Sequence, residues 1–162
     1  MRGIARLALL ASALAALVAC GPICGFGASL SLSNARVDPS YSCPYPANNL
    51  PYDIHASIDA KNTSGIISLQ LRSIEETWMN IAAHGNWTGT KGAYGTVSIT
   101  RFSPGSIGPG VGATIRFVLS FECTNSGAGA ETWGDFSFKF VVKTNGGDYT
   151  ISPNHHRLTF GG

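Results

Sequence analysis

The sequence is poor in charge, in clustered basic residues and in long apolar runs. Only 12% of its 162 residues are charged, and the formal net charge is +2. The Lys and Arg residues are scattered singly, so no basic stripe exists that could follow a nucleic-acid backbone by releasing counterions. The longest apolar stretch, residues 7–18, has about 12 residues, whereas a membrane-spanning helix needs about 20. We therefore expect neither nucleic-acid binding nor a transmembrane helix.

Motifs that carry enzyme chemistry are also missing. The nearest approach to a serine-hydrolase elbow, Pro104-Gly-Ser106-Ile-Gly108, lacks the first glycine. The surrounding Pro- and Gly-rich stretch 104–112 is predicted to be a loop, and it lacks the lysine of a phosphate-binding loop. We expect a non-enzymatic protein, with a small envelope hydrolase as a weaker alternative.

The residues required for a glycosidase site or a metal site are present but not suitably arranged. A glycosidase would need two carboxylates that face each other across a cleft, and we expect the available ones to lie on solvated β faces or in loops. These carboxylates are Glu75, Glu76, Glu122, Glu131 and Asp135. The adjacent His155 and His156 would point to opposite faces of a strand, which does not suit a metal site. No metal and no cofactor are expected.

The first 20 residues have the pattern of an export signal. Arg2 and Arg6 precede the apolar stretch 7–18. The stretch ends in Leu17-Val18-Ala19-Cys20, which resembles the lipobox of bacterial lipoproteins. The resemblance implies that residues 1–19 are removed as a signal peptide and that Cys20 receives lipid chains, palmitate among them. Such an anchor is stable, since each buried methylene contributes about 0.8 kcal/mol.

The location of the protein follows from this resemblance. Gly21 is similar to an outer-membrane address in a host with two membranes, because the retention signal of such lipoproteins is typically Asp at that position. Residues 20–28 are Gly-rich and predict a flexible tether that leads to one domain, residues 29–162. The alternative is ordinary cleavage after Ala15 or Gly27, which would give a secreted protein.

Cysteine usage points to a single disulfide bond. The four cysteines are Cys20, Cys24, Cys43 and Cys123. If Cys20 is lipidated and Cys24 lies in the tether, Cys43 and Cys123 remain as the natural pair. An exported chain meets an oxidising compartment in which such a bridge persists. Cys24 would then be an odd thiol, and its spacing from Cys20 is one residue too long for a redox dithiol.

Period-two alternation of apolar and polar residues dominates the rest of the chain. In the stretch 114–122, Ile115, Phe117, Leu119 and Phe121 alternate with mostly polar neighbours. Cys123 continues the apolar parity, so its sulfur should point into the core. Further strands are predicted at 29–37, 52–61, 66–74, 96–102, 136–144, 149–151 and 157–160. Residues 74–83 suit a short helix or a strand with Trp78 inward about equally well.

An antiparallel β-sandwich of about 7–8 strands is the fold class that this pattern favours. The chain loosely resembles immunoglobulin-like and fibronectin-like domains of exported bacterial proteins, through Cys43-Pro44, residues 54–65 and Phe121-Glu-Cys123. The resemblance implies an Ig-like sandwich that acts as a binding or structural interaction module of the cell envelope. It departs from antibody domains because Cys43 lies among prolines, in a predicted loop, and no Tyr precedes Cys123 by two residues.

A carbohydrate-binding or accessory module is the alternative function. Trp87 and Trp133 lie beside turn-forming residues, which makes them better candidates than Trp78 for exposed rings that stack on sugars. The two hypotheses differ in one structural respect. A sugar platform requires Trp87 and Trp133 to be exposed and coplanar on one face.

Overall fold

The computed structural model describes residues 29–87, 89–124 and 132–160, and its regular secondary structure in these ranges consists of β-strands alone. The predicted signal peptide 1–19, the lipidation site Cys20, Gly21, Cys24 and the tether 20–28 lie outside the described residues. So do residues 125–131, which include the turn expected at 125–130 from its Asn, Ser and Gly residues, and the last two residues of the predicted domain.

Eleven strands are present in the described ranges, against the 7–8 predicted. They are β1 (Leu30–Val37), β2 (Ser40–Cys43), β3 (Leu50–Asn62), β4 (Leu69–His84), β5 (Tyr94–Ile99), β6 (Phe102–Ser103), β7 (Ser106–Ile107), β8 (Gly112–Cys123), β9 (Trp133–Thr144), β10 (Gly147–Ile151) and β11 (His156–Phe160). The three unpredicted strands, β2, β6 and β7, have only 4, 2 and 2 residues. Strands of two residues cannot show a period-two pattern, and β2 alternates over only four residues.

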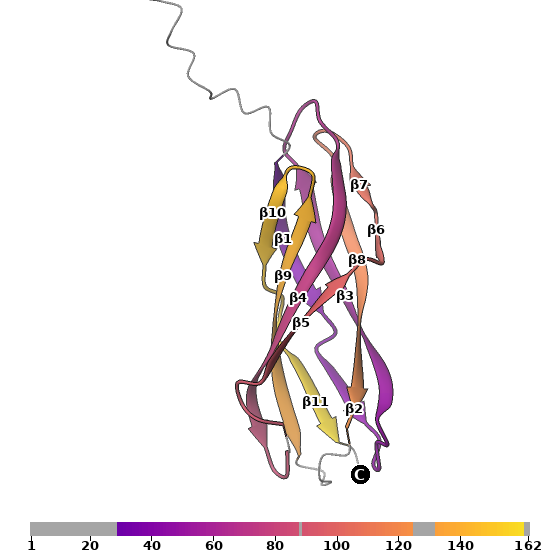
Figure 1. Ribbon diagram of the computed structural model, residues 1–162, viewed down its shortest axis with the longest axis vertical. Coiled ribbons are helices and arrows are strands. Elements are labelled where there is room, and N and C mark those ends of the chain that lie inside the picture. Colours follow the sequence, from indigo (N-terminus) through magenta and orange to yellow (C-terminus); the bar gives the residue numbers. More distant parts are fainter. Residues whose placement is uncertain (1–28, 88, 125–131, 161–162) are drawn as a thin grey trace, which may run out of the picture.

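The strands form two sheets that pack face to face (Figure 1). The four-stranded sheet has the order β1-β3-β8-β6, and the seven-stranded sheet has the order β2-β11-β9-β4-β5. In the latter, β10 also pairs with β9, and β7 also pairs with β4. All neighbouring strands are antiparallel except β2 and β11, which are parallel. The all-β, sandwich-like architecture predicted from the alternation is confirmed.

The inner faces of the two sheets bury the apolar half of each alternating strand. Ile54 and Ile58 of β3 and Ile115 and Leu119 of β8 are almost completely buried, as is Phe140 of β9 on the opposing sheet. The ring of Phe117 meets that of Phe140 edge to face, with centroids 5.1 Å apart. Each such side chain stabilises the fold by about 1.5–3 kcal/mol through removal from water.

Residues 74–83 form a strand, so the helical alternative is wrong. They belong to β4, whose two edges pair with β9 and β5 and thereby satisfy the backbone groups of the segment. Ile74, Glu76 and Asn80 are buried, and Trp78 packs against the core, as period two requires. The predicted strand 66–74 is the first part of β4, which begins at Leu69.

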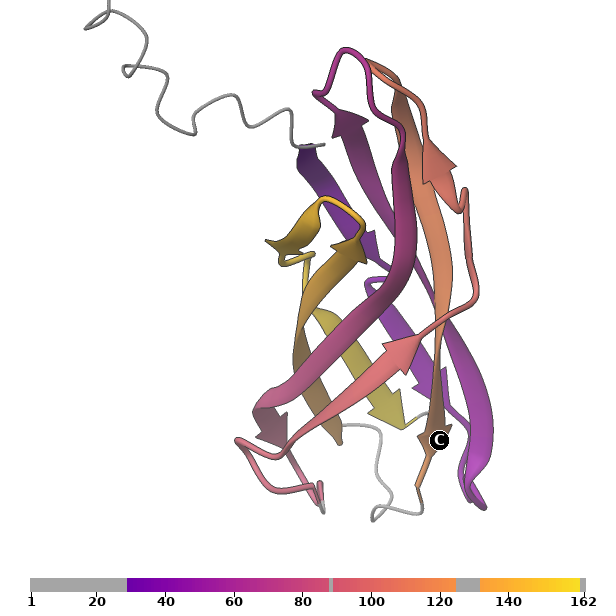
Figure 2. The same cartoon turned by 45° about the horizontal axis from the view of Figure 1, so that its top comes forward.

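Strand pairing also corrects three predictions about where strands and loops lie. The predicted strand 96–102 divides, because β5 belongs to the seven-stranded sheet whereas β6 pairs with β8 in the other sheet (Figure 2). The predicted loop 104–112 contains β7, which pairs with the start of β4. Cys43 ends β2 rather than lying in a loop. In each case pairing with a distant strand decides the local structure.

The chain also changes sheets between β1 and β2, and polar side chains hold this crossing. The Asn154 amide accepts a hydrogen bond from the Val37 N–H and donates one to the Val37 carbonyl, each at 3.0 Å. The His156 Nδ1–H donates to the Asp38 carbonyl at 2.7 Å. His156 is buried, and burial lowers its pKa, although its contacts with Asp38 and Asp135 oppose the shift. The histidine therefore acts here as a neutral structural donor.

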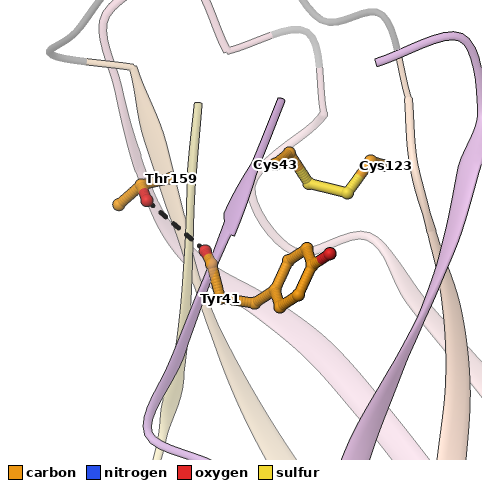
Figure 3. The surroundings of a disulfide bond; sticks show 4 residues. All are labelled: Tyr41, Cys43, Cys123 and Thr159. Carbon is orange, nitrogen blue, oxygen red and sulfur yellow. Dashed lines mark hydrogen bonds between the residues drawn. A yellow bond between two sulfur atoms is a disulfide. The ribbon is translucent and has the colours of Figure 1, made fainter. Parts of the chain in front are cut away.

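The predicted disulfide bond between Cys43 and Cys123 is present, with a Cα–Cα distance of 5.8 Å. It joins β2 of the seven-stranded sheet to β8 of the four-stranded sheet, and both cysteines are fully buried. Tyr41 lies beside the bridge, and its carbonyl accepts a hydrogen bond from the Thr159 hydroxyl (Figure 3). The Tyr41 ring stacks on that of Tyr52 at 4.4 Å. The bridge thus closes the core at this end of the sandwich.

Removing the disulfide should destabilise the protein substantially. The bridge closes a loop of 80 residues, and loss of such a constraint on the unfolded chain costs about 2–5 kcal/mol. We expect the double variant Cys43→Ser, Cys123→Ser to show that loss in urea unfolding under non-reducing conditions. Dithiothreitol should lower the stability of the wild type toward that of the variant and leave the variant unchanged. Equal stability of the two proteins without reductant would contradict the prediction.

Candidate functional site

A groove of about 850 Å³ lies over the outer face of the four-stranded sheet. Its charged and titratable lining residues are Arg36, Asp38, Asp53, His55, Arg101 and Arg116. The alternation that buries one face of β3 and β8 turns the opposite parity outward, and Arg101 joins the groove from the crossing between β5 and β6. We call this surface the arginine groove. Arg36, Arg101 and Arg116 are all exposed within it.

Two of the arginines occupy one cross-strand row. Arg36 of β1 pairs with Ser57 of β3, and Ser57 in turn pairs with Arg116 of β8. Since neighbouring strands are about 4.8 Å apart, the backbones of the two arginines are separated by about 10 Å with a small hydroxyl residue between them. Guanidinium groups present planar sets of donors that match carboxylate and phosphate oxygens. The row is therefore suited to hold an anionic group above Ser57.

The acidic residues of the groove have partners of their own. The backbone N–H and the ring of His55 contact Asp38 Oδ2 at 2.8 and 3.0 Å. Burial raises the pKa of Asp38, but these hydrogen bonds outweigh it and leave the pKa below its usual value. Asp53 accepts a hydrogen bond from Ser120 at 3.1 Å. These contacts occupy the carboxylates and leave the arginines facing solvent.

None of the three arginines forms an ion pair within 4.0 Å in the described part of the chain. The pairs found there join His55 to Asp38, Lys143 to Glu75 and Arg157 to Asp135. Arg36 and Arg116 contribute at longer range to the lowered pKa of Asp59, after the hydrogen bonds from Asn34 and Thr114. The sequence suggested only scattered positive charges. The fold brings three of them to one groove, which no sequence pattern signals.

A second cavity, of about 390 Å³, opens beside the first between the edges of β5 and β8. Beyond Phe117, no described strand pairs with this edge of β8, and the outer edge of β5 has no described partner either. The lining residues include Trp78, Val97, Ile99, Leu119 and Phe121. We call this cavity the edge cleft. Arg101, Val118 and Ser120 line both cavities, so they adjoin.

Glu76 lies in the edge cleft and is only 2% exposed. Its Oε1 atom is buried and has no hydrogen-bond partner. Burial raises the pKa of the Glu76 carboxyl to about 7. The expectation that Glu76 is solvated is wrong, because the strand register of β4 turns it to the same face as Trp78. The burial of Glu76 was implicit in the strand alternative for residues 74–83. Residues two apart share a face of a strand, so an inward Trp78 places Glu76 inward as well.

Trp87 and Trp133 lie on opposite sides of the seven-stranded sheet. The Trp87 ring packs on the core side, with its centroid 5.6 Å from that of Phe160, and its Nε1 is buried without a partner. Trp133 faces outward, where it stacks on His84 at 5.6 Å and lies 4.1 Å from the Arg157 guanidinium. Both tryptophans are partly buried. The structure therefore does not join them into one flat platform.

No group of three or more His, Cys, Asp or Glu residues in the described ranges is arranged to hold a metal ion. In the same ranges, no helix is long and apolar enough to cross a membrane.

Comparison with known proteins places the chain in no family. No family model matches the sequence, and no curated protein matches it. Among solved structures, ApaA of Bordetella pertussis is similar with 10% identity and a TM-score of 0.39, covering 83% of this chain and 95% of ApaA. The sporulation control protein Spo0M of Bacillus subtilis is similar with 15% identity and a TM-score of 0.35, covering 80% of this chain and 50% of Spo0M. Neither likeness is close enough to support an argument about function.

The buried carboxyl predicts an unusual pH dependence of stability. Glu76 loses its proton near pH 4.5 in the unfolded chain but only near pH 7 in the folded one. Between these values Glu76 binds its proton more strongly in the folded state, so its contribution to the free energy of unfolding falls as pH rises, by about 1–3 kcal/mol. Glu76→Gln should abolish this fall and be the more stable protein above pH 7.

Urea unfolding of both proteins between pH 4 and 8 measures the effect. Glu75→Gln is the matched control, because Glu75 is the next residue on β4, points to the outer face and pairs with Lys143 at 2.8 Å. The control should keep the wild-type fall in stability. A Glu76→Gln variant that still shows it would refute the assignment.

Proposed function

We propose that this protein is an exported, lipid-anchored Ig-like domain that binds an anionic group of the cell envelope through the arginine groove. The observation that carries the proposal is the convergence of Arg36, Arg101 and Arg116 on one groove without ion-pair partners within the described residues. The domain acts by binding and performs no catalysis.

The strand order supports the Ig-like assignment. The sheet β1-β3-β8-β6 has the order of strands A, B, E and D of an immunoglobulin domain, and β11-β9-β4-β5 has the order of G, F, C and C′. The parallel pairing of β2 with β11 suits a first strand that is split between the two sheets. The disulfide differs from the antibody pattern, since it links β2 to β8 instead of strands B and F.

The start of β1 and the disulfide bond lie at opposite ends of the domain, and this arrangement suits an anchor at Cys20. Leu30, at the start of β1, pairs with the last residue of β3, whereas Cys123 pairs with the first. The disulfide end therefore lies about 40 Å from the start of β1, since β3 spans 13 residues with a rise of about 3.3 Å each. Figure 1 shows β3 and β8 running along the length of the domain. An anchor on the preceding tether would direct the disulfide end away from the membrane and leave the arginine groove accessible along the side.

The chemistry of the groove favours a discrete anionic group over nucleic acid. The groove also contains Asp38 and Asp53, and the chain after its leader has nine basic and nine acidic residues, once Arg2 and Arg6 are set apart from the 11 and 9 of the whole sequence. A phosphate backbone requires many clustered cations. One carboxylate, phosphate or sulfate group of an envelope polymer or lipid needs only the two arginines that flank Ser57.

Replacing the paired arginines should weaken anion binding. We expect the double variant Arg36→Ala, Arg116→Ala to lower affinity for polygalacturonate, an anionic polymer used as probe, by 10-fold or more, since hydrogen bonds to charged groups contribute about 1.5–3 kcal/mol each. Binding should also weaken with added salt. The control Arg72→Ala, Lys139→Ala removes the same two positive charges from β4 and β9, outside the groove, and should leave affinity unchanged. An equal effect of both changes, or no binding by the wild type, would contradict the proposal.

The anchor has a direct test in the mass of the protein purified from the membranes of its own host. We expect the chain from Cys20 with a multi-acyl modification, and two thiols that become reactive only on reduction. Cys20→Ala should be neither acylated nor cleaved before residue 20. An unmodified chain in the soluble fraction would show that the protein is secreted without an anchor, and would leave the groove prediction to be tested separately.

A further inference from the structure

The edge cleft has the shape and lining of a small ligand site. Its volume of about 390 Å³ is within the range of about 300–1,000 Å³ that is usual for ligand pockets. Val97 and Ile99 from β5 and Leu119 and Phe121 from β8 form apolar walls. Val97 is 51% exposed at this opening, although it points to the same side of β5 as the core residues. The cleft therefore presents unfilled apolar surface that solvent reaches.

Among the residues that line the cleft, Glu76 has a buried side-chain oxygen, Oε1, without a hydrogen-bond partner. A buried oxygen without a hydrogen bond is costly, and a buried carboxylate without a partner is more so. Across the strands, Glu76 lies between Val97 and Phe140, neither of which offers a side-chain donor. A ligand that brings a donor to this oxygen would gain the hydrogen bond that the protein itself does not make.

None of the charged side chains around the cleft donates a hydrogen bond to Glu76 within the described residues. Arg101 is the only other charged residue that lines it, and no ion pair within 4.0 Å joins Arg101 to Glu76. Lys139 and Lys143 of β9 and Glu122 of β8 belong to the parity that faces outward. Within the described residues, no cation of the protein neutralises the Glu76 carboxylate.

From this geometry we propose that the edge cleft binds an apolar molecule that carries a primary amine, whose ammonium group donates to the Glu76 carboxylate. The apolar part of the ligand covers Trp78, Val97 and Phe121, and the amine replaces the missing partner of Oε1. The chemistry is shared by two sources. One is a free hydrophobic amine, and the other is a lysine side chain of a peptide extended along the unpaired edge of β5.

Three matched probes test the chemistry on the full-length protein. They are 3-phenylpropylamine, 3-phenylpropan-1-ol and 3-phenylpropionate, which share an apolar body and differ in the terminal group. Trp fluorescence reports occupancy, because Trp78 lines the cleft, and backbone amide shifts of β5 and β8 locate it. We expect the amine to bind at least 10-fold more tightly than the alcohol at pH 8, and the carboxylate not to bind.

Two variants separate the role of Glu76 from that of the apolar walls. Glu76→Gln should reduce amine affinity to that of the alcohol, whereas Glu75→Gln on the outer face should leave it unchanged. Val97→Phe fills the opening from an exposed position and should abolish binding of both the amine and the alcohol while the fold is retained. Equal affinity of amine and alcohol, unchanged amine affinity in Glu76→Gln, or absence of amine binding to the folded wild type would each overturn the inference.

A peptide arm distinguishes the two sources. If acetyl-Val-Lys-Val-amide binds more tightly than 3-phenylpropylamine and shifts the amides of β5, the ligand is a lysine of a protein partner. If the free amine binds more tightly, the ligand is a small molecule. Both outcomes support the site. They are independent of the arginine groove, whose variants Arg36→Ala and Arg116→Ala lie outside the cleft and should not affect amine binding.

Discussion

The shared apolar core between β3–β8 and β4–β9 is the constraint on which the other features of this structure depend. Ile58, Ile115, Ile74 and Phe140 are fully buried in it. Because side chains alternate along a strand, burial of one face determines what the opposite face presents to solvent. The row of Arg36, Ser57 and Arg116 is a consequence of that register. A shift of one residue in β8 would bury Arg116 and expose the apolar residues beside it.

Two of the crossings between the sheets have different consequences for the candidate sites. The crossing between β1 and β2 is held by Asn154 and His156, whose hydrogen bonds satisfy the backbone there. The crossing between β5 and β6 passes through Arg101 and leaves the adjacent edges of β5 and β8 unpaired in the described part of the chain. Both candidate cavities adjoin at this second crossing. The candidate binding surfaces are therefore found where the sandwich is least closed.

The two cavities differ in chemistry although they share three lining residues. The arginine groove is lined by three exposed arginines, and charge interactions there are weakened by salt. The edge cleft is lined mainly by apolar residues, and burial raises the pKa of its Glu76 carboxyl to about 7. In the low dielectric around the buried Glu76 carboxyl, a single hydrogen bond or ion pair has a larger effect than at the exposed arginines. One extended partner that carried both an anionic and a cationic group would meet complementary charges in the two adjoining cavities.

The sequence by itself determined the β architecture and the inward direction of Cys123, because period-two alternation is a local property of the chain. It also indicated the pairing of Cys43 with Cys123, because only these two cysteines remain once Cys20 and Cys24 are assigned to the anchor and the tether. The anchor at Cys20 likewise is predicted from a local motif alone. Only the tertiary structure decided that residues 74–83 are a strand, since two partner strands override a local pattern that suits either form. It alone decided that Glu76 is buried and that Arg36, Arg101 and Arg116 share one groove. These residues are far apart in the chain, and the pairing of β1, β3 and β8 with the crossing after β5 brings them together.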